Sequence, residues 1–402
     1  MKILILCNKS PYPPKEGGPI AMNAIIEGLA DAGHQVKVLA INSNKYGVDV
    51  KEIPESYRQK TGIETVYIDL SIKPADAFLN LFTGKSYHVE RFISDAFREK
   101  LTHILNKETF DIVQLETLYI SPYIETIRKY SDARIILRAH NIEHLIWERV
   151  AAITRNPLKK IYLHHLAKTL KKYELGVLPK FDGIVTITGK DGEYFGKMGC
   201  KVPMIAIPFG IDIEKIKKNP GIEAEFPSLF SIGAMNWMPN EEGIKWFLEN
   251  VWPLVHRAYP ELKFYIAGRA MPDWLLQTRL RNVVIVGEVD DAFDFMYSKA
   301  IEIVPLFSGS GIRIKIIEGM AAGKAVVSTS IGAEGINVEH GKNILLADDP
   351  DNFFKAVSQC VEDESFTHKL GMNARELIQK EHSNRILIQK LVEFYQLTGA
   401  LK

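Results

Sequence analysis

The feature that most constrains the fold is an alternation, along most of the chain, of short apolar runs with longer amphipathic stretches. The apolar runs are rich in Val, Ile and Leu, which is typical of strands buried on both faces of a parallel sheet. The stretches between them, such as 21–32 closed by Gly33, are typical of helices that cover such a sheet. The sequence therefore predicts an α/β protein with doubly wound parallel sheets. The predicted strands are 2–6, 35–41, 112–115, 134–137 and 183–187, followed by 229–232, 264–267, 283–286, 302–305 and 325–328.

A polar segment with the turn Asn219-Pro220-Gly221 interrupts this alternation, which then restarts. We therefore predict two Rossmann-like domains that face each other across a cleft. The N-terminal, acceptor-side domain covers 1–212, the C-terminal donor domain covers 213–383, and a last helix at 384–402 returns to the N-terminal domain. Ligands of open α/β sheets bind beyond the carboxyl ends of the strands, so we expect functional residues in the loops that follow strands.

Composition argues against several other classes of protein. The 402 residues carry 50 Lys and Arg against 49 Asp and Glu, so the net charge of +1 does not indicate a nucleic-acid partner. Cys7, Cys200 and Cys360 lie far apart, which argues against a disulfide framework or a zinc site and fits a reducing cytosol. The apolar run 3–7 is shorter than a signal-peptide core of ~7–15 residues, and no stretch approaches the ~18–20 residues of a membrane span. We expect a cytoplasmic protein, either free or attached to the inner face of the membrane.

The most informative segment is 308–323, which opens a helix after a glycine-containing turn at 309–311. Such a turn presents backbone N–H groups at a helix N-terminus, where an anion is favoured. Arg313 and Lys315 add positive charge there, and Glu318 shares a helix face with Lys315. We interpret this as a diphosphate site near Arg313 and Lys315, with Glu318 accepting hydrogen bonds from ribose hydroxyls. The alternative is a Lys315–Glu318 ion pair on a solvated face. A GxxxxGK[ST] motif is absent, which disfavours an NTPase.

The run from Ile303-Val304-Pro305-Leu306 through Lys315 and Glu318 to Met320-Ala321-Ala322-Gly323 resembles the donor-binding core of glycosyltransferase family 4. Members of that family are retaining enzymes with the GT-B fold. The resemblance spans nearly the whole chain. It implies transfer of a sugar from a nucleotide-diphosphate sugar to a hydroxyl of a carbohydrate or lipid-linked acceptor, in bacterial surface polysaccharide or glycoconjugate synthesis. We expect no metal and no other cofactor, because cationic side chains and a helix end can serve the diphosphate.

The resemblance also implies site residues. His140 matches a histidine that lies against the transferring sugar in the family, and His140, Arg313 and Lys315 are the expected catalytic residues. The expected donor-binding residues are Gly17, Gly18, Gly233, Glu288, Val289, Gly309, Ser310, Gly311, Ile312 and Glu318.

The chain departs from the family pattern at two places. The family often carries two glutamates eight residues apart, and Ser310 stands where the first of them, which contacts the donor sugar, is usual. Ala234 and Glu242 stand nearest to the positions of an Arg and a Lys that neutralise the diphosphate in the family. We therefore expect Arg313 and Lys315 to carry the phosphate charge instead.

A basic stretch at 151–180 contains only one acidic residue, Glu174. Apolar residues are interleaved with its lysines, so the stretch has the pattern of a basic amphipathic helix. Attachment to an anionic membrane surface and a simply solvated helix face are equally compatible with this pattern. The basic residues are Arg155, Lys159, Lys160, Lys168, Lys171, Lys172 and Lys180, and the apolar ones are Ile161, Leu163, Leu166 and Leu170.

Three other functions compete with glycosyl transfer. A nicotinamide-dependent dehydrogenase is disfavoured, because no GxGxxG follows the first strand and no acidic residue ends the strand 35–41. A sugar-nucleotide epimerase of the same fold is the nearest enzymatic alternative. A non-catalytic nucleotide-sugar binding protein is the third, motivated by Ser310, Ala234 and Glu242.

Overall fold

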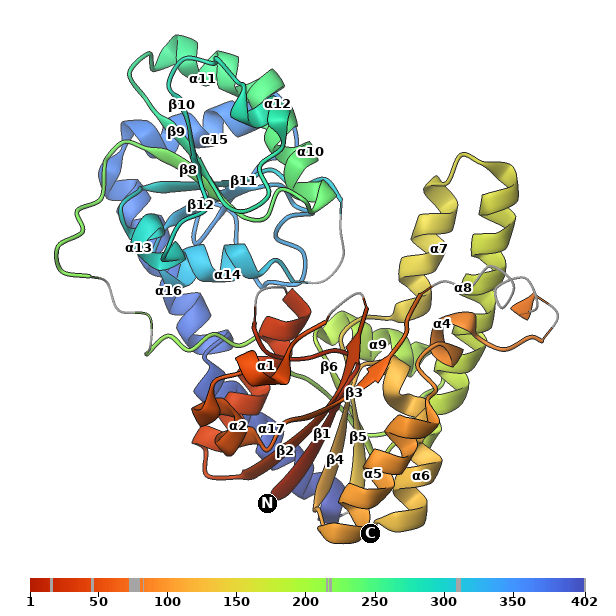
Figure 1. Cartoon of the computed structure of the whole chain (residues 1–402). Coiled ribbons are helices and arrows are strands. Elements are labelled where there is room, and N and C mark those ends of the chain that lie inside the picture. Colours follow the sequence, from red (N-terminus) through yellow and green to blue (C-terminus); the bar gives the residue numbers. More distant parts are fainter. Residues whose placement is uncertain are drawn as a thin grey trace. The chain divides into compact units, whose positions relative to one another are not determined.

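The computed structural model describes residues 1–14, 17–44, 47–71, 80–81, 83–214, 216, 219–308 and 312–400 (Figure 1). The chain divides into two compact units. Unit 1 consists of Met1–Gly210 together with Leu387–Lys402, and unit 2 is Ile211–Ile386. Each unit is built on one parallel sheet with flanking helices, which confirms the predicted α/β class.

The sheet of unit 1 has the strand order β3-β2-β1-β4-β5-β6-β7, and every neighbouring pair is parallel. The register is fixed at the centre, where Leu6 lies opposite Leu39 on one side and Leu115 on the other. The strands are β1 (Lys2–Cys7), β2 (Gln35–Ser43), β3 (Glu64–Ile68), β4 (Ile112–Glu116), β5 (Arg134–Ala139), β6 (Gly183–Thr186) and β7 (Met204–Ala206).

Alternate residues of these strands enter two separate cores. Ile3 and Ile5 pack in a core with α1, α2 and α17, whereas Leu4 and Leu6 face α5, α6, α8 and α9. This is why most positions of the central strands are apolar. The helices of unit 1 are α1 (Gly17–Asp31), α2 (Glu55–Thr61), α4 (Tyr87–Glu90), α5 (Asp95–Lys107), α6 (Ile124–Tyr130), α7 (Glu143–Ile153), α8 (Pro157–Val177), α9 (Gly189–Lys197) and α17 (Asn384–Ala400), with short 3₁₀ turns at Val50–Glu52, Leu118–Tyr123 and Leu178–Lys180.

The sheet of unit 2 has the order β10-β9-β8-β11-β12-β13 and is also parallel throughout. Its strands are β8 (Leu229–Ile232), β9 (Phe264–Ala267), β10 (Val283–Gly287), β11 (Ile301–Val304), β12 (Ala325–Ser328) and β13 (Leu345–Leu346). Its helices are α10 (Met238–Trp246), the π-helical turn Phe247–Val251, α11 (Trp252–Ala258), α12 (Asp273–Leu276), α13 (Ala292–Tyr297), α14 (Ile314–Ala321), α15 (Pro350–Glu362) and α16 (Glu364–Glu381).

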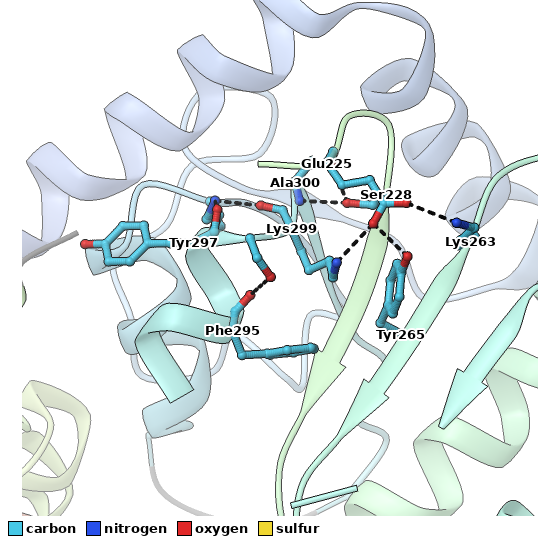
Figure 2. Close-up of polar contacts among 10 residues, drawn as sticks. Glu225, Ser228, Lys263, Tyr265, Phe295, Tyr297, Lys299 and Ala300 are labelled. Atoms are coloured by element: carbon cyan, nitrogen blue, oxygen red, sulfur yellow. Dashed lines mark hydrogen bonds and ion pairs between the residues drawn. The ribbon is translucent and has the colours of Figure 1, made fainter. Parts of the chain in front are cut away.

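The amino-terminal edge of this second sheet is closed by structural polar contacts (Figure 2). The carboxylate of Glu225 accepts hydrogen bonds from the Tyr265 hydroxyl at 2.7 Å and from Lys299 Nζ at 3.0 Å. Lys299 Nζ also lies 3.8 Å from the centre of the Tyr265 ring. Burial would raise the pKa of Glu225, but these partners outweigh it and lower the pKa. Because these polar groups bond to one another, they link the strands at this edge and have a structural role.

The opposite, carboxyl edge of each sheet has the geometry of a ligand site. Both strand orders place the first strand of the unit beside the fourth, so β1 neighbours β4 and β8 neighbours β11. At such a switch point the two flanking loops diverge to opposite faces of the sheet and leave a crevice for a ligand. No helix among the described residues is both long and apolar enough to cross a membrane.

Candidate functional site

The switch point of unit 2 begins at Gly233, which directly follows β8. Its φ of +155° is a conformation that residues with a side chain rarely adopt. A Cβ at this position would lie 2.9 Å from Asn240 Nδ2 and 2.9 Å from Lys315 Nζ, and a Cβ at Gly268, after β9, would clash with the Gly233 carbonyl. The absence of side chains at Gly233 and Gly268 therefore allows two polar side chains to approach the backbone where β8 ends.

Lys315 lies in the first turn of α14 and is fixed by a single side chain. Its Nζ donates to Asn240 Oδ1 at 2.7 Å, and Asn240 Nδ2 donates to the Ala234 carbonyl at 2.8 Å. Burial lowers the pKa of Lys315, and the nearby carboxyl groups of Glu302 and Glu318 oppose this shift. The lysine bonds Asn240 rather than pairing with Glu318, so the solvated Lys315–Glu318 ion pair is not the arrangement observed.

A buried carboxyl group interacts electrostatically with this lysine. Glu302 in β11 is fully buried, and neither of its carboxyl oxygens has a hydrogen-bond partner in the described part of the chain. A Cβ at Gly319 would clash with Glu302 Oε2, so the small residue on α14 makes room for the carboxyl group. Burial raises the pKa of Glu302, while Lys315 opposes the shift and Glu318 adds to it. Burial also raises the pKa of the partly buried Glu318 to about 7.

The other residues expected on the donor side lie in three places. Arg313 is 4% exposed at the N-cap position of α14, where burial lowers its pKa and the carboxylate of Glu334 opposes that shift. Ile312 directly precedes it and is partly buried. After β10, Glu288 is exposed and Val289 packs against the apolar cluster around Phe230. Gly309, Ser310 and Gly311 lie outside the described residues.

In unit 1, His140 directly follows β5 and contacts the end of β4. Its Nε2 lies 2.6 Å from Glu116 Oε2, and Glu116 is fully buried. The same carboxylate accepts from Arg138 Nη1 at 3.2 Å and from Gln114 Nε2 at 2.7 Å. Burial would raise the pKa of Glu116, but Arg138, His140 and Gln114 outweigh it and lower the pKa. Burial lowers the pKa of His140, against the opposing effect of Glu116.

These shifts define the state of the imidazole. With Glu116 ionised and His140 neutral, Nε2 carries the proton and donates a hydrogen bond to the carboxylate. Nδ1 is then an acceptor, and it makes no hydrogen bond with any residue that the structure describes.

Two further features lie at the carboxyl edge of the first sheet. Gly17 and Gly18 begin α1, and a Cβ at Gly18 would lie 2.9 Å from Lys9 Cε, so the lysine side chain passes over this glycine. The charge of Lys9 also contributes to the lowered pKa of His140. Thr117, directly after β4, has a φ of +81°, which is strained for a β-branched residue. Backbone strain of this kind is concentrated at functional sites.

Sequence reasoning did not identify four of these residues as part of a site. Glu116, Arg138 and Glu302 had a usable signal, because each is a charged residue in an otherwise apolar strand and must therefore have a structural or functional reason to be there. Asn240 had no comparable signal, because its role depends on a contact with Lys315, 75 positions away. The described residues contain no group of three or more His, Cys, Asp or Glu side chains placed to hold a metal ion.

Two parallel sheets, each with a switch point at its carboxyl edge, define an α/β protein of two units, and in unit 2 a partly buried lysine lies against a glycine at that switch point. Residues 226–363 match the family described as glycosyl transferases group 1. This segment contains β8 to β13 and all the site residues described in unit 2.

Two relatives of the chain bear on its activity. A 44.6 kDa protein of the cps region of Klebsiella pneumoniae is 24% identical over 96% of this chain and 97% of its own length. The capsular polysaccharide biosynthesis glycosyltransferase CapM of Staphylococcus aureus is 24% identical over 46% of this chain and 52% of its own length. Together with the family match, these relatives indicate a glycosyltransferase.

Solved structures show the same fold over the whole chain. Sucrose-phosphate synthase from Thermosynechococcus elongatus superposes with a TM-score of 0.72 at 15% identity, covering 100% of both chains. Anabaena HepE in complex with UDP and glucose superposes with a TM-score of 0.65 at 15% identity, covering 98% of this chain and 99% of its own.

Proposed function

We propose that this chain is a retaining glycosyltransferase of family 4 that uses a nucleoside-diphosphate sugar as donor. Its acceptor is a hydroxyl group of a carbohydrate or a lipid-linked carbohydrate in bacterial surface polysaccharide synthesis. The observation that carries the proposal is Lys315, held by Asn240 against the backbone of Gly233 at the switch point of unit 2. A partly buried cation beside partly buried backbone at a strand end is suited to an anionic ligand.

The donor is held in unit 2 according to this proposal. Lys315 and Arg313 neutralise the diphosphate, and the charge that develops on it as it leaves is stabilised by the same groups. Such fixed electrostatic stabilisation is worth ~3–4 kcal/mol per group in other enzymes. Burial raises the pKa of the Glu318 carboxyl group, which accepts hydrogen bonds from the ribose hydroxyls. Because side chains supply the positive charge, the reaction proceeds without a metal ion.

His140 acts on the sugar in the proposed reaction. Its Nε2–H is committed to Glu116, which fixes the tautomer and leaves Nδ1 to accept a hydrogen bond from a hydroxyl of the transferring sugar. The imidazole stays neutral, because its lowered pKa lies below physiological pH. The acceptor hydroxyl then attacks the anomeric carbon from the face that the diphosphate leaves. The bond from that carbon to the diphosphate oxygen breaks, and this oxygen takes the hydroxyl proton, which gives retention.

Calorimetry with UDP, GDP, ADP and dTDP tests the donor site. Lys315→Ala and Glu318→Ala should weaken the affinity for the preferred diphosphate by about tenfold to a hundredfold, since a hydrogen bond to a charged group contributes ~1.5–3 kcal/mol. Lys245→Ala, at an exposed lysine of α10, is the matched control and should leave the affinity unchanged. His140→Ala should also leave the affinity unchanged but lower the turnover number.

Each outcome has a contrary result. Loss of nucleotide binding in His140→Ala, with full binding in Glu318→Ala, would contradict the assigned roles. An inverted product anomer by NMR would contradict retention, and full loss of activity in a chelator would contradict the metal-independent reaction. Nucleotide binding with neither transfer nor donor hydrolysis would leave a non-catalytic binding protein as the better description.

A further inference from the structure

The basic stretch of the sequence forms most of a helical hairpin in unit 1. Helices α7 and α8 lie side by side and are joined by Thr154, Arg155 and Asn156 (Figure 1). The hairpin stands away from the sheet of unit 1, with this joining turn at its tip. Asn156 caps α8 by accepting a hydrogen bond from the Lys159 backbone N–H at 3.0 Å, so the tip is an ordered turn.

The base of the hairpin is firmly anchored. His144 is fully buried, with Nδ1 2.6 Å from Glu174 Oε2 and Nε2 2.8 Å from the Tyr194 hydroxyl. Glu174 also accepts from the backbone N–H groups of Glu143 and His144 at 3.0 and 3.1 Å. All polar groups of this histidine are satisfied, so it fixes the hairpin to unit 1 and is not available to a substrate.

The leucines that the sequence suggested as an apolar membrane face are buried. Leu163 and Leu166 pack against Tyr87 and Ala151 between the helices, and Leu170 belongs to the main core of unit 1. That part of the sequence interpretation is wrong, because the period of the leucines reflects packing within the protein.

A different set of apolar residues is exposed at the tip. Ile153 ends α7 and is 79% exposed, Leu158 in the first turn of α8 is 79% exposed, and Ile161 one turn further is 68% exposed. None of the three belongs to a buried cluster. Large aliphatic side chains grouped at a projecting turn are a marker of an interaction surface.

The charge around this tip has one sign. From Arg149 to Tyr173 the chain has seven Lys and Arg residues and no Asp or Glu. Arg155 and Lys159 flank the apolar tip, and their side chains form no ion pair or hydrogen bond with another described residue. The acidic residue next to this stretch, Glu148, pairs with Lys171 at 3.6 Å, and Glu174 is buried at the base.

We propose that the tip of the α7–α8 hairpin docks unit 1 on an anionic lipid surface. Ile153, Leu158 and Ile161 enter the boundary of headgroups and acyl chains, while Arg155 and Lys159 bind lipid phosphates. A projecting, convex apolar tip with uniform positive charge is suited to a fluid anionic bilayer, which accommodates any convex shape and supplies many phosphates. The proposal goes beyond glycosyl transfer and does not depend on it.

Vesicle flotation of the full chain tests the docking. We expect binding to phosphatidylglycerol-containing vesicles, weaker binding in high salt, and no binding to phosphatidylcholine alone. Each basic residue near an anionic surface contributes about fivefold to the partition coefficient, so Arg155→Glu with Lys159→Glu should lower it by at least about 20-fold. Replacing Ile153, Leu158 and Ile161 together by Ser should lower it by at least about tenfold.

Matched controls lie on unit 2. Arg279→Glu with Arg281→Glu changes two exposed arginines, and Leu276→Ser with Leu280→Ser changes two exposed leucines, so both should bind vesicles as the unmodified chain does. All variants should keep the melting temperature, because the changed side chains are exposed. Equal vesicle binding by the hairpin and control variants would overturn the proposal. A dimer in sedimentation velocity that the tip variant abolishes, without vesicle binding, would instead assign the tip to a second copy of the chain.

Discussion

Replacing Glu116 by Gln should destabilise unit 1 by about 3–5 kcal/mol, because it leaves the buried guanidinium of Arg138 without a counterion. Both side chains are fully buried, and Arg138 Nη1 lies 3.2 Å from Glu116 Oε2. The folded-state pKa of Glu116 lies below its ordinary value of 4.5. Its contribution to stability is therefore present above about pH 4.5 and is lost as the pH falls toward the folded-state pKa. Glu116→Gln should lack that acid dependence.

The two charges should not contribute additively. Glu116→Gln with Arg138→Met removes both of them, so the double variant should recover about 2 kcal/mol or more relative to the sum of the two single losses. His140→Ala removes a hydrogen bond but keeps the ion pair, and it should cost only about 1–2 kcal/mol.

The assay is urea unfolding, and hydrogen exchange of peptides from β4 and β5 monitors it. The measurement therefore reports on unit 1 alone. Far-UV circular dichroism in water checks that each variant folds. If the loss in the double variant equals the sum of the single losses within about 0.5 kcal/mol, then Glu116 does not compensate Arg138 and the reasoning is refuted.

Two further predictions concern unit 2. Gly233→Ala should weaken the affinity for a nucleoside diphosphate at least about tenfold by calorimetry, because the new Cβ would lie 2.9 Å from both Asn240 Nδ2 and Lys315 Nζ. Gly189→Ala, where a Cβ meets nothing within 4 Å, is its control, and equal affinity of the two variants would show that the close approach is unimportant. The stability of the Glu302→Gln variant relative to the unmodified chain should increase as the pH rises from about 5 to 8. Burial raises the pKa of Glu302, so the folded protein keeps a proton that the unfolded chain releases near 4.5, and stability falls over this range. Urea midpoints at several pH values measure this, and a difference that does not change with pH would contradict it.

The central strands could be predicted from the sequence, whereas three of the four edge strands could not. β1 is buried except at Lys2, so residues 3–7 form an unbroken apolar run, and the fully buried β4 is apolar apart from Gln114 and Glu116. Three edge strands, β3, β7 and β13, were not predicted. β3 contains Tyr67 at 61% exposure, and β13 has only two residues, so neither carries the pattern of a doubly covered strand.

For the site, the sequence indicated the loops but not the contacts within them. The switch-point positions of Gly18, Gly233 and Lys315 follow from strand–loop–helix order, which a linear pattern contains. The partner of Lys315 depends on how α10 and α14 pack together, and no local pattern encodes that distance. The helical period of Leu163 and its neighbours likewise could not show which surface they cover.

The final helix has a consequence for how the chain folds as it is synthesised. The hydroxyl of Tyr395 on α17 donates to Gln114 in β4, and Phe394 and Thr398 approach Gly183 of β6 so closely that a Cβ there would lie 2.9 Å from each. One face of the first sheet is therefore completed by residues that leave the ribosome after all of unit 2. Unit 2 is a single continuous segment and can close as soon as it emerges, whereas the strands of unit 1 must wait for a helix that is made after unit 2. In this chain, the order of synthesis and the order of completed folding run in opposite directions.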